Sequence, residues 1–348
     1  MPKKNPKTLC LVAGGSGGHI IPALTIGEKW KQNNPDGSII FFVNTVKDLD
    51  KKIVGQSNQI DQKIFIRLIN IPGKKLWLYP KFIFQFFASL IKSLFVFLRN
   101  KPTEIISTGG HIALPVCFAS FILRIPINLY ELNFVPGKAI KALSYLATNI
   151  FLTFKKSDQF FGARKNKCIP INYPLKYTKK DLEFDKSKTI RSINLKTFDA
   201  NKKTLFVLGG SQGSIFINNL IKTWLKENHS DNLSNIQIIH QTGDSDQTDW
   251  DSFYKQFYIP VFHFKYSDQI KEFYQISDLV ICRGGAGTLF ELEFFKKKAL
   301  IIPLETSYTN HQLDNAIAMA IQNDDLFTVI RKKDILQPLE IKKYLLLS

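Results

Sequence analysis

The chain has 348 residues, of which 45% are hydrophobic and 22% charged, so it is long enough for two domains and too apolar to be mainly disordered. Lysine and arginine total 47 against 29 aspartate and glutamate residues, a formal net charge of +18. This excess fits an anionic partner, such as a phosphorylated substrate, an acidic membrane face or a nucleic acid, but a general enrichment in lysine explains it equally well. The four cysteines are scattered without paired spacing, which predicts buried thiols in a reducing compartment.

Short apolar runs alternate with longer segments of helical period along the whole chain, a pattern typical of parallel α/β units. The first run follows a short basic start and soon meets glycines, which predicts a core strand rather than a signal peptide and a protein that stays in the cytoplasm. The predicted strands are residues 8–13, 38–43, 63–69, 104–107, 125–130, 204–208, 236–241, 261–264, 279–282 and 299–302.

A polar and basic segment, residues 162–203, separates the two series of strands. We place the domain junction in it, so that residues 1–164 form the first domain and residues 165–348 the second. Each half opens with a strand that runs into glycines and then into a helix. The expected fold class is therefore α/β, with two doubly wound Rossmann-like domains facing a cleft and ligands beyond the carboxyl ends of the strands.

Residues 14–18 read Gly-Gly-Ser-Gly-Gly between the first strand and the first helix. Glycines there permit positive φ and close approach of the backbone to a ligand, while the start of the helix offers unpaired N–H groups to an anion. A plain tight turn is the alternative, although four glycines exceed what a turn needs. The spacing is not G-x-G-x-x-G, which disfavours a nicotinamide cofactor.

His19 follows this turn directly. It could be a core imidazole, a phosphate contact or a general base. A position at the start of a helix favours the neutral imidazole that a base requires, so we expect a functional role.

Two further glycine turns follow strands in the second half. In the first of them, Gly-Gly-Ser-Gln-Gly-Ser, Ser211 can donate a hydrogen bond to a phosphate oxygen. In the second, Cys-Arg-Gly-Gly-Ala-Gly-Thr-Leu-Phe-Glu, Glu291 can accept hydrogen bonds from a ribose diol, or it can simply complement the helix dipole. Neither turn has the Lys-Ser/Thr ending of a P-loop, which disfavours Mg²⁺-dependent nucleotide hydrolysis. The amides and imidazole of residues 310–316 can read sugar hydroxyls.

Together and in this order, the motifs resemble those of the MurG family, which transfers N-acetylglucosamine from its UDP donor to undecaprenyl-linked muramyl-pentapeptide in peptidoglycan synthesis. The resemblance runs from about Leu9 to about Arg331 and includes GGSGGHIIPAL, STGGHIALP, YELNFVPG, LGGSQGS, CRGGAGTLFELEFF and NHQLDNA. It implies a GT-B fold, UDP-N-acetylglucosamine as donor and a polyprenyl-pyrophosphate-linked acceptor. It also implies inversion at the anomeric carbon without a metal or another cofactor, at the cytoplasmic face of the inner membrane.

The resemblance further implies a set of site residues, with the donor mainly against the second domain and His19 as the catalytic base. Donor contacts fall on Ser16, Gly17, Gly18, Asn133, Lys176, Ser211, Ser267, Ala286, Gly287, Thr288, Glu291, His311 and Gln312, and acceptor contacts on Gly15, His111, Tyr130 and Glu131. Three motifs depart from the family pattern. Tyr-Glu-Leu-Asn replaces His-Glu-Gln-Asn at residues 130–133, His111 replaces a tyrosine or phenylalanine, and Lys176 replaces an arginine and loses bidentate reach.

The apolar run at residues 82–98 approaches the length of a membrane span, but Gln85 and Lys92 interrupt it. A buried helix of the first domain and a true span are the alternatives to a peripheral contact. The excess of aromatic residues with lysines at the edge fits partial insertion at an anionic lipid surface best. The predicted patch consists of Trp77, Phe82, Phe86, Lys74, Lys75 and Lys81.

Two other functions stay open at this point. One is a related GT-B glycosyltransferase that acts on another lipid acceptor, such as diacylglycerol. The other is a non-enzymatic nucleic-acid-binding protein, which is disfavoured because the basic residues form no single helix face or arm and no nucleic-acid motif is present. We therefore expect no nucleic-acid partner.

Overall fold

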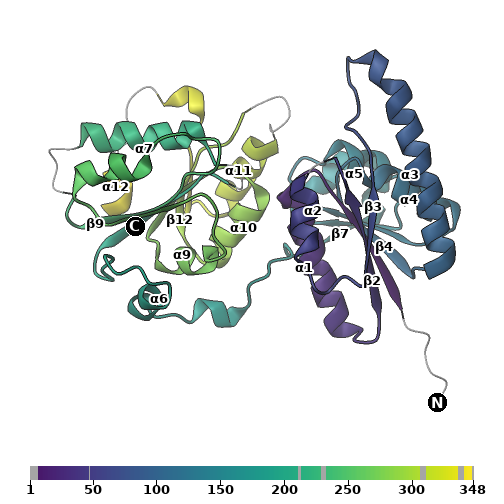
Figure 1. The fold of residues 1–348 in the computed structure, drawn as a ribbon, viewed down its shortest axis with the longest axis horizontal. Coiled ribbons are helices and arrows are strands. Elements are labelled where there is room, and N and C mark those ends of the chain that lie inside the picture. The colour runs from purple at the N-terminus through teal and green to yellow at the C-terminus, as the bar shows by residue number, and fades with distance from the viewer. Residues whose placement is uncertain are drawn as a thin grey trace. The chain divides into compact units, whose positions relative to one another are not determined.

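The computed structural model describes residues 7–46, 48–210, 213–228, 233–305, 311–335 and 341–346. The chain forms two compact units, of which the first ends at Lys176 and the second begins at Tyr177 (Figure 1). Each unit contains one parallel sheet flanked by helices.

The first sheet has seven strands in the order β3-β2-β1-β4-β5-β6-β7. The strands are β1 Thr8–Ala13, β2 Ser38–Asn44, β3 Gln62–Ile66, β4 Glu104–Gly109, β5 Ile127–Glu131, β6 Asn149–Leu152 and β7 Cys168–Pro170. The helices are α1 Gly17–Asn33, α2 Asp48–Gly55, α3 Tyr79–Asn100, α4 Ala113–Ile122 and α5 Lys138–Leu143, with 3₁₀ segments at Leu76–Leu78 and Lys155–Lys167.

Alternate residues of β1 pack on opposite faces of the first sheet, as the two-residue period of a strand requires. Leu9 and Leu11 join a cluster that contains Ile20 of α1. Cys10 and Val12 join the other cluster, which contains residues of α3 and α4. Because both faces are covered, the strand is a continuous apolar run, which is the pattern from which it was predicted.

The second sheet has six strands in the order β10-β9-β8-β11-β12-β13, which repeats the order of the first six strands of the first sheet. The strands are β8 Lys203–Leu208, β9 Ile236–Gln241, β10 Val261–Phe264, β11 Leu279–Cys282, β12 Lys298–Ile301 and β13 Phe327–Val329. The helices are α6 Lys186–Ser192, α7 Ile215–Glu227, α8 Trp250–Tyr254, α9 Ile270–Ile276, α10 Ala286–Phe294, α11 His311–Gln322 and α12 Ile341–Leu346, with 3₁₀ segments at Lys179–Leu182, Lys255–Phe257 and Lys332–Asp334.

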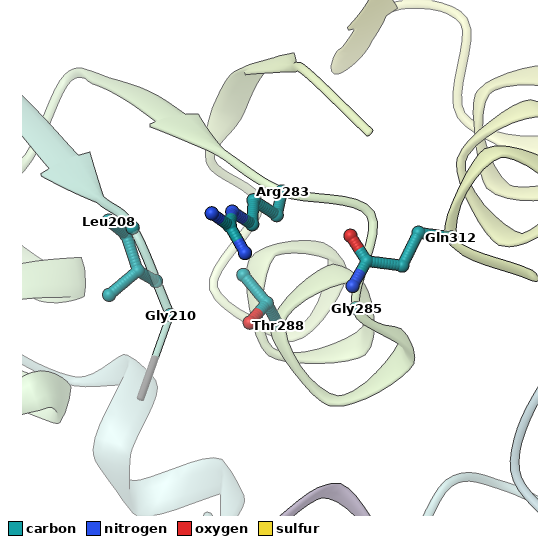
Figure 2. A pocket seen from close by; sticks show the side chains of 7 residues that line it. Leu208, Gly210, Arg283, Gly285, Thr288 and Gln312 are labelled. Atoms are coloured by element: carbon teal, nitrogen blue, oxygen red, sulfur yellow. The ribbon is translucent and has the colours of Figure 1, made fainter. Parts of the chain in front are cut away.

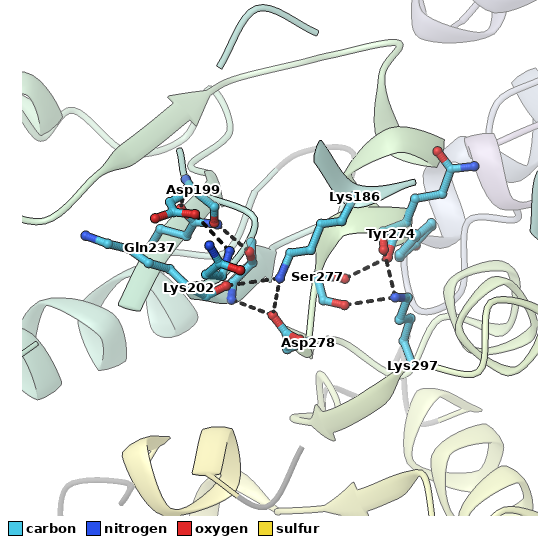
Figure 3. Close-up of polar contacts among 11 residues, drawn as sticks. Lys186, Asp199, Lys202, Gln237, Tyr274, Ser277, Asp278 and Lys297 are labelled. Atoms are coloured by element: carbon cyan, nitrogen blue, oxygen red, sulfur yellow. Dashed lines mark hydrogen bonds and ion pairs between the residues drawn. The ribbon is translucent and has the colours of Figure 1, made fainter. Parts of the chain in front are cut away.

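The boundary between the units differs from the predicted one. Residues 165–176 belong to the first unit because β7 pairs with β6, with Cys168 opposite Ile150. The chain after Tyr177 is tied to the second sheet, where Asp278 Oδ2 accepts hydrogen bonds from Lys186 Nζ at 2.9 Å and from the Thr204 amide at 2.7 Å (Figure 3). A boundary at residue 164 would therefore cut a strand from its sheet.

All ten predicted strands are present. The largest shift is in β3, which ends at Ile66 instead of residue 69. Three strands were not predicted, namely β6, β7 and β13, and they have four, three and three residues.

Helix α3 divides its apolar residues between two faces, so the residues of the predicted patch are not equally exposed. Phe86 packs against the core of the first unit, and Phe82 is only half-exposed. The exposed apolar residues of this region are Leu76, Trp77, Ile83, Phe84, Phe87, Ile91, Phe95 and Leu98, with Phe84 at 75% and Phe95 at 68%. The segment Leu76–Asn100 is long and apolar enough for a membrane span by length and composition alone, and 33% of its most apolar window is buried.

Candidate active site

The turn at residues 14–18 leaves the carboxyl end of β1 and starts α1, as predicted. Ser16 precedes the helix in an extended conformation and makes no capping hydrogen bond with its side chain. Asp50 of α2 is fully buried, and its Oδ2 accepts the Gly15 amide at 2.9 Å. One N–H group of this turn is thus engaged by an acidic side chain of the protein.

His19 lies in the first turn of α1 and is half-buried. Thr108 Oγ1 donates to the His19 carbonyl at 2.7 Å, which ties the helix to the end of β4. The imidazole rests on Gly109, where φ is +111° and an added Cβ would lie 3.2 Å from His19 Cε1. Glycine at this position therefore lets the ring sit close to the sheet edge while it keeps some access to solvent.

Glu131 ends β5 and is only 2% exposed. Its Oε1 accepts the Asn133 amide at 2.9 Å and Asn133 Nδ2 at 3.2 Å, while its Oε2 accepts the Gly137 amide at 2.9 Å. Burial raises the pKa of Glu131 to about 7 against the opposing effect of these hydrogen bonds. The side chain predicted to face the acceptor thus shapes the loop that carries Asn133.

The remaining first-unit residues of the predicted site lie at the same sheet edge or at the end of the unit. His111 Nε2 lies 2.9 Å from the Leu68 carbonyl and 3.0 Å from Asn44 Nδ2, so this ring is fastened to the neighbouring segment. The ring of Tyr130 packs against that of Phe151 in a tilted arrangement, with ring centres 4.6 Å apart. Lys176 is exposed at the last position of the unit.

The second unit contains a pocket of about 170 Å³ at the carboxyl ends of β8 and β11. Figure 2 shows the side chains of Arg283, Thr288 and Gln312 converging on it. The lining residues are Leu208, Gly209, Gly210, Arg283, Gly285, Thr288 and Gln312.

The sheet explains why these residues meet. β8 and β11 are neighbouring parallel strands with Leu208 opposite Cys282, so the segments that follow them leave the same edge. An added Cβ at Gly284 would lie 2.2 Å from the Gln312 carbonyl, so only glycine allows α11 to approach this closely. The start of α10 completes the pocket with N–H groups that have no partner within the helix.

Arg283 is the cation of this pocket, and the predicted site did not include it although the motif around it was recognised. An arginine guanidinium has a pKa far above neutral pH. Burial lowers the pKa of the Arg283 guanidinium, but the group stays charged at neutral pH. Its position directly after β11 was the signal in the sequence that could have identified it.

Five of the predicted donor residues of the second unit lie in or beside the pocket. Thr288 and Gln312 line it, and Ala286 and Gly287 form the first turn of α10. Glu291 lies three residues after Thr288, on the same side of α10, and its Oε2 accepts the Tyr274 hydroxyl at 3.0 Å.

Two other predicted donor residues of this unit, Ser267 and His311, do not line the pocket. Ser267 Oγ accepts the Gln269 amide at 3.1 Å just before α9. His311 starts α11, and burial lowers its pKa, which favours the neutral ring. Ser211 falls outside the described residues. The other predicted donor residues, Ser16, Gly17, Gly18, Asn133 and Lys176, belong to the first unit.

Both halves of the chain match models of known domains. Residues 9–152 match the glycosyltransferase family 28 N-terminal domain, and residues 204–346 match the glycosyltransferase family 28 C-terminal domain. These two regions contain the glycine turns and the pocket described above. The fold and the site therefore define a glycosyltransferase of family 28.

Curated relatives narrow this class to one family. A protein of Pelagibacter ubique is 34% identical over 315 residues, which cover 89% of this chain and 81% of the relative. A protein of Francisella philomiragia is 30% identical over 349 residues, which cover 96% of this chain and 89% of the relative. The chain belongs to the family that both names describe, the UDP-N-acetylglucosamine–N-acetylmuramyl-(pentapeptide) pyrophosphoryl-undecaprenol N-acetylglucosamine transferases.

The fold is shared with solved structures of the same class. The crystal structure of Acinetobacter baumannii MurG superposes with a TM-score of 0.70 at 20% identity, and the match covers 98% of this chain and 90% of that one. The prediction of two doubly wound domains with GT-B architecture is confirmed.

Proposed function

We propose that this protein transfers N-acetylglucosamine from UDP-N-acetylglucosamine to undecaprenyl-pyrophosphoryl-N-acetylmuramyl-pentapeptide. The observation that carries the proposal is the 34% identity to a transferase of that name across 89% of the chain. The pocket of the second unit supports it, because a guanidinium beside the start of a helix suits a nucleotide diphosphate.

In this proposal the donor binds mainly to the second unit. Arg283 and the amides of Ala286 and Gly287 bind the diphosphate, and Glu291 accepts hydrogen bonds from the ribose hydroxyls. The backbone near Ser267 reads the uracil edge. His311 and Gln312, at the start of α11, contact the sugar.

The proposed reaction is a displacement at the anomeric carbon of the donor sugar. The acceptor hydroxyl oxygen forms a bond to that carbon, the bond from the carbon to the β-phosphate oxygen breaks, and UDP leaves with the electron pair. His19 takes the hydroxyl proton as general base. Arg283 and the start of α10 stabilise the negative charge that develops on the departing diphosphate.

A transfer assay with radiolabelled UDP-N-acetylglucosamine tests the activity. The acceptor panel contains the undecaprenyl-linked muramyl-pentapeptide, undecaprenyl phosphate and diacylglycerol. We expect label in the first lipid product only. Label in the diacylglycerol product alone would assign the chain to a different lipid acceptor, and label in none would remove the proposed activity.

Glu291→Ala tests the donor site separately from the acceptor. One hydrogen-bonded charged contact contributes about 1.5–3 kcal/mol, so the Kd for UDP measured by calorimetry should rise by about 10- to 150-fold. Glu293→Ala is the matched control, because this residue is on the same helix and accepts Asn323 Nδ2 at 3.0 Å. Unchanged UDP affinity in a folded Glu291→Ala protein would remove Glu291 from the site.

We also propose that the protein works as a peripheral protein on an anionic membrane surface at the cytoplasmic face. The exposed face of α3 offers Phe84, Phe87 and Phe95, and Lys81 lies exposed near its start. Apolar residues that face solvent on a helix with a basic edge suit insertion at the level of the lipid headgroups.

Vesicle sedimentation tests this location. Replacing Lys74, Lys75 and Lys81 with glutamate should abolish binding to vesicles that contain anionic lipid, since each basic residue near the surface contributes about 1 kcal/mol. Changing the exposed Lys179 and Lys180 of the second unit to glutamate is the control. Retention of the protein in membranes after an alkaline carbonate wash would contradict a peripheral contact.

A further inference from the structure

Tyr274 of α9 is fully buried, yet its hydroxyl reaches the carboxylate of Glu291 on α10. The hydroxyl donates to Glu291 Oε2 at 3.0 Å. Burial raises the pKa of Tyr274 well above its usual value, and the charge of Glu291 adds to that rise. The hydroxyl therefore stays protonated and remains a donor across the working pH range of a cytoplasmic enzyme.

The ring of Tyr274 has little freedom to move. Its centre lies 5.7 Å from that of Phe206 on β8 and 5.5 Å from that of Phe295, which follows α10. Ser277 Oγ donates to the Tyr274 carbonyl at 3.0 Å, so the backbone is also held (Figure 3). A donor fixed in this way restrains the position of the carboxylate that accepts its hydrogen bond.

Helix α9 also connects the contact between Tyr274 and Glu291 to the turn that precedes α9. The turn before α9 contains Ser267, whose Oγ accepts the Gln269 amide. Tyr274 lies seven residues after Ser267, so one short helix links the segment assigned to the uracil edge with the residue that holds Glu291. A carboxylate has about four acceptor sites on its two oxygens, and the tyrosine hydroxyl occupies one of them.

We propose that Tyr274 is a positioning residue that orients Glu291 for the ribose hydroxyls and so contributes to the selectivity of the donor site for a ribonucleotide. This inference rests on the proposed donor site. Tyr274 itself does not contact the donor. It acts by holding the Glu291 carboxylate in one orientation before the nucleotide binds.

Tyr274→Phe tests the inference, because the ring packing is kept and only the hydroxyl is removed. We expect the KM for UDP-N-acetylglucosamine and the Kd for UDP to rise about tenfold, while kcat at saturating donor changes by less than about twofold. The ratio of the affinities for UDP and for 2′,3′-dideoxy-UDP should fall towards that of Glu291→Ala. The double variant should lose no more than Glu291→Ala alone.

Tyr254→Phe is the matched control. Tyr254 is also buried in the second unit, and its hydroxyl lies 2.7 Å from His240 Nδ1, in a different cluster of side chains. Its loss should lower the melting temperature as a buried hydroxyl does, but it should leave the ratio of UDP to dideoxy-UDP affinity unchanged. An equal change of that ratio in both variants would reduce Tyr274 to a structural role.

The affinity ratios of the Glu291 and Tyr274 variants test the donor site and the positioning role of Tyr274 separately. If Glu291→Ala leaves the ratio unchanged, the proposed donor site is wrong. If Glu291→Ala lowers the ratio but Tyr274→Phe does not, the donor site stands and the positioning role of Tyr274 is wrong. Additive losses in the double variant would also overturn the positioning role, because two residues that act through one contact cannot add fully.

Discussion

The glycine turns after β1 and β11 both lead from a parallel strand into a helix, but they differ in the charge beside them. After β1, the Gly15 amide donates to the buried acid Asp50, and a second buried acid, Glu131, ends β5. After β11, the guanidinium of Arg283 shares a pocket with the start of α10. An acidic group does not attract a diphosphate, whereas a guanidinium does. Similar glycine patterns therefore do not imply similar ligands, because the side chains around the turn decide what it binds.

The variant with the largest expected effect tests whether His19, which follows the turn after β1, takes part in proton transfer. His19→Ala should lower kcat by about 10²–10⁴-fold if the imidazole is the base, while the Kd for UDP stays within about twofold. Steady-state kinetics and calorimetry measure the two quantities. His263→Ala, which removes a histidine paired with Asp251 at 3.2 Å, is the control. A loss of donor affinity with normal turnover at saturation would instead give the first turn a role in binding phosphate.

Substitutions of Arg283 should have an intermediate effect, and they test the role of the turn after β11. Arg283→Ala should raise the Kd for UDP by about 10- to 150-fold, since a hydrogen bond to a charged group contributes about 1.5–3 kcal/mol. Binding of uridine, which has no phosphate, should be unaffected. Arg283→Lys should recover part of the loss, because it keeps the charge without the bidentate geometry. Equal losses for UDP and uridine would show that Arg283 supports the pocket rather than the diphosphate.

The smallest expected effect concerns the buried acid at the edge of the first sheet. The pKa of Glu131 is about 7 in the folded protein and near 4.5 for a free side chain. Its stabilising contribution is therefore complete below pH 4.5 and is lost as the pH rises through 7. The free energy of unfolding should fall by roughly 1.4 kcal/mol per pH unit at the steepest point of this window. Denaturant unfolding at several pH values should show that slope in the wild type and not in Glu131→Gln.

Most of the fold could be predicted because the central strands are covered on both faces and are continuously apolar. The three unpredicted strands are too short for a period of two residues to be visible, and β7 contains Pro170. The unit boundary was misplaced for the same reason, since β7 is what holds residues 165–176 to the first sheet.

The candidate site could be predicted only where a motif is local. The turns after β1 and β11 were evident, but the contact of Tyr274 with Glu291 joins two helices and leaves no pattern in the sequence. The buried and exposed faces of α3 were also not separated, because apolar residues lie on both of them. Packing against the first sheet, and not composition, determines that Phe86 is partly buried and Phe84 exposed.

The position of the first strand in each sheet has a consequence for synthesis of the chain. β1 lies between β2 and β4, and its contact with the segment before β4 joins residues 95 positions apart, Thr8 and Thr103. β8 lies in the same way between β9 and β11. A growing chain can therefore pair only one side of each central strand until the fourth strand of that unit has left the ribosome. During that interval an apolar strand has an open edge, which favours binding by chaperones and makes interrupted synthesis prone to aggregation.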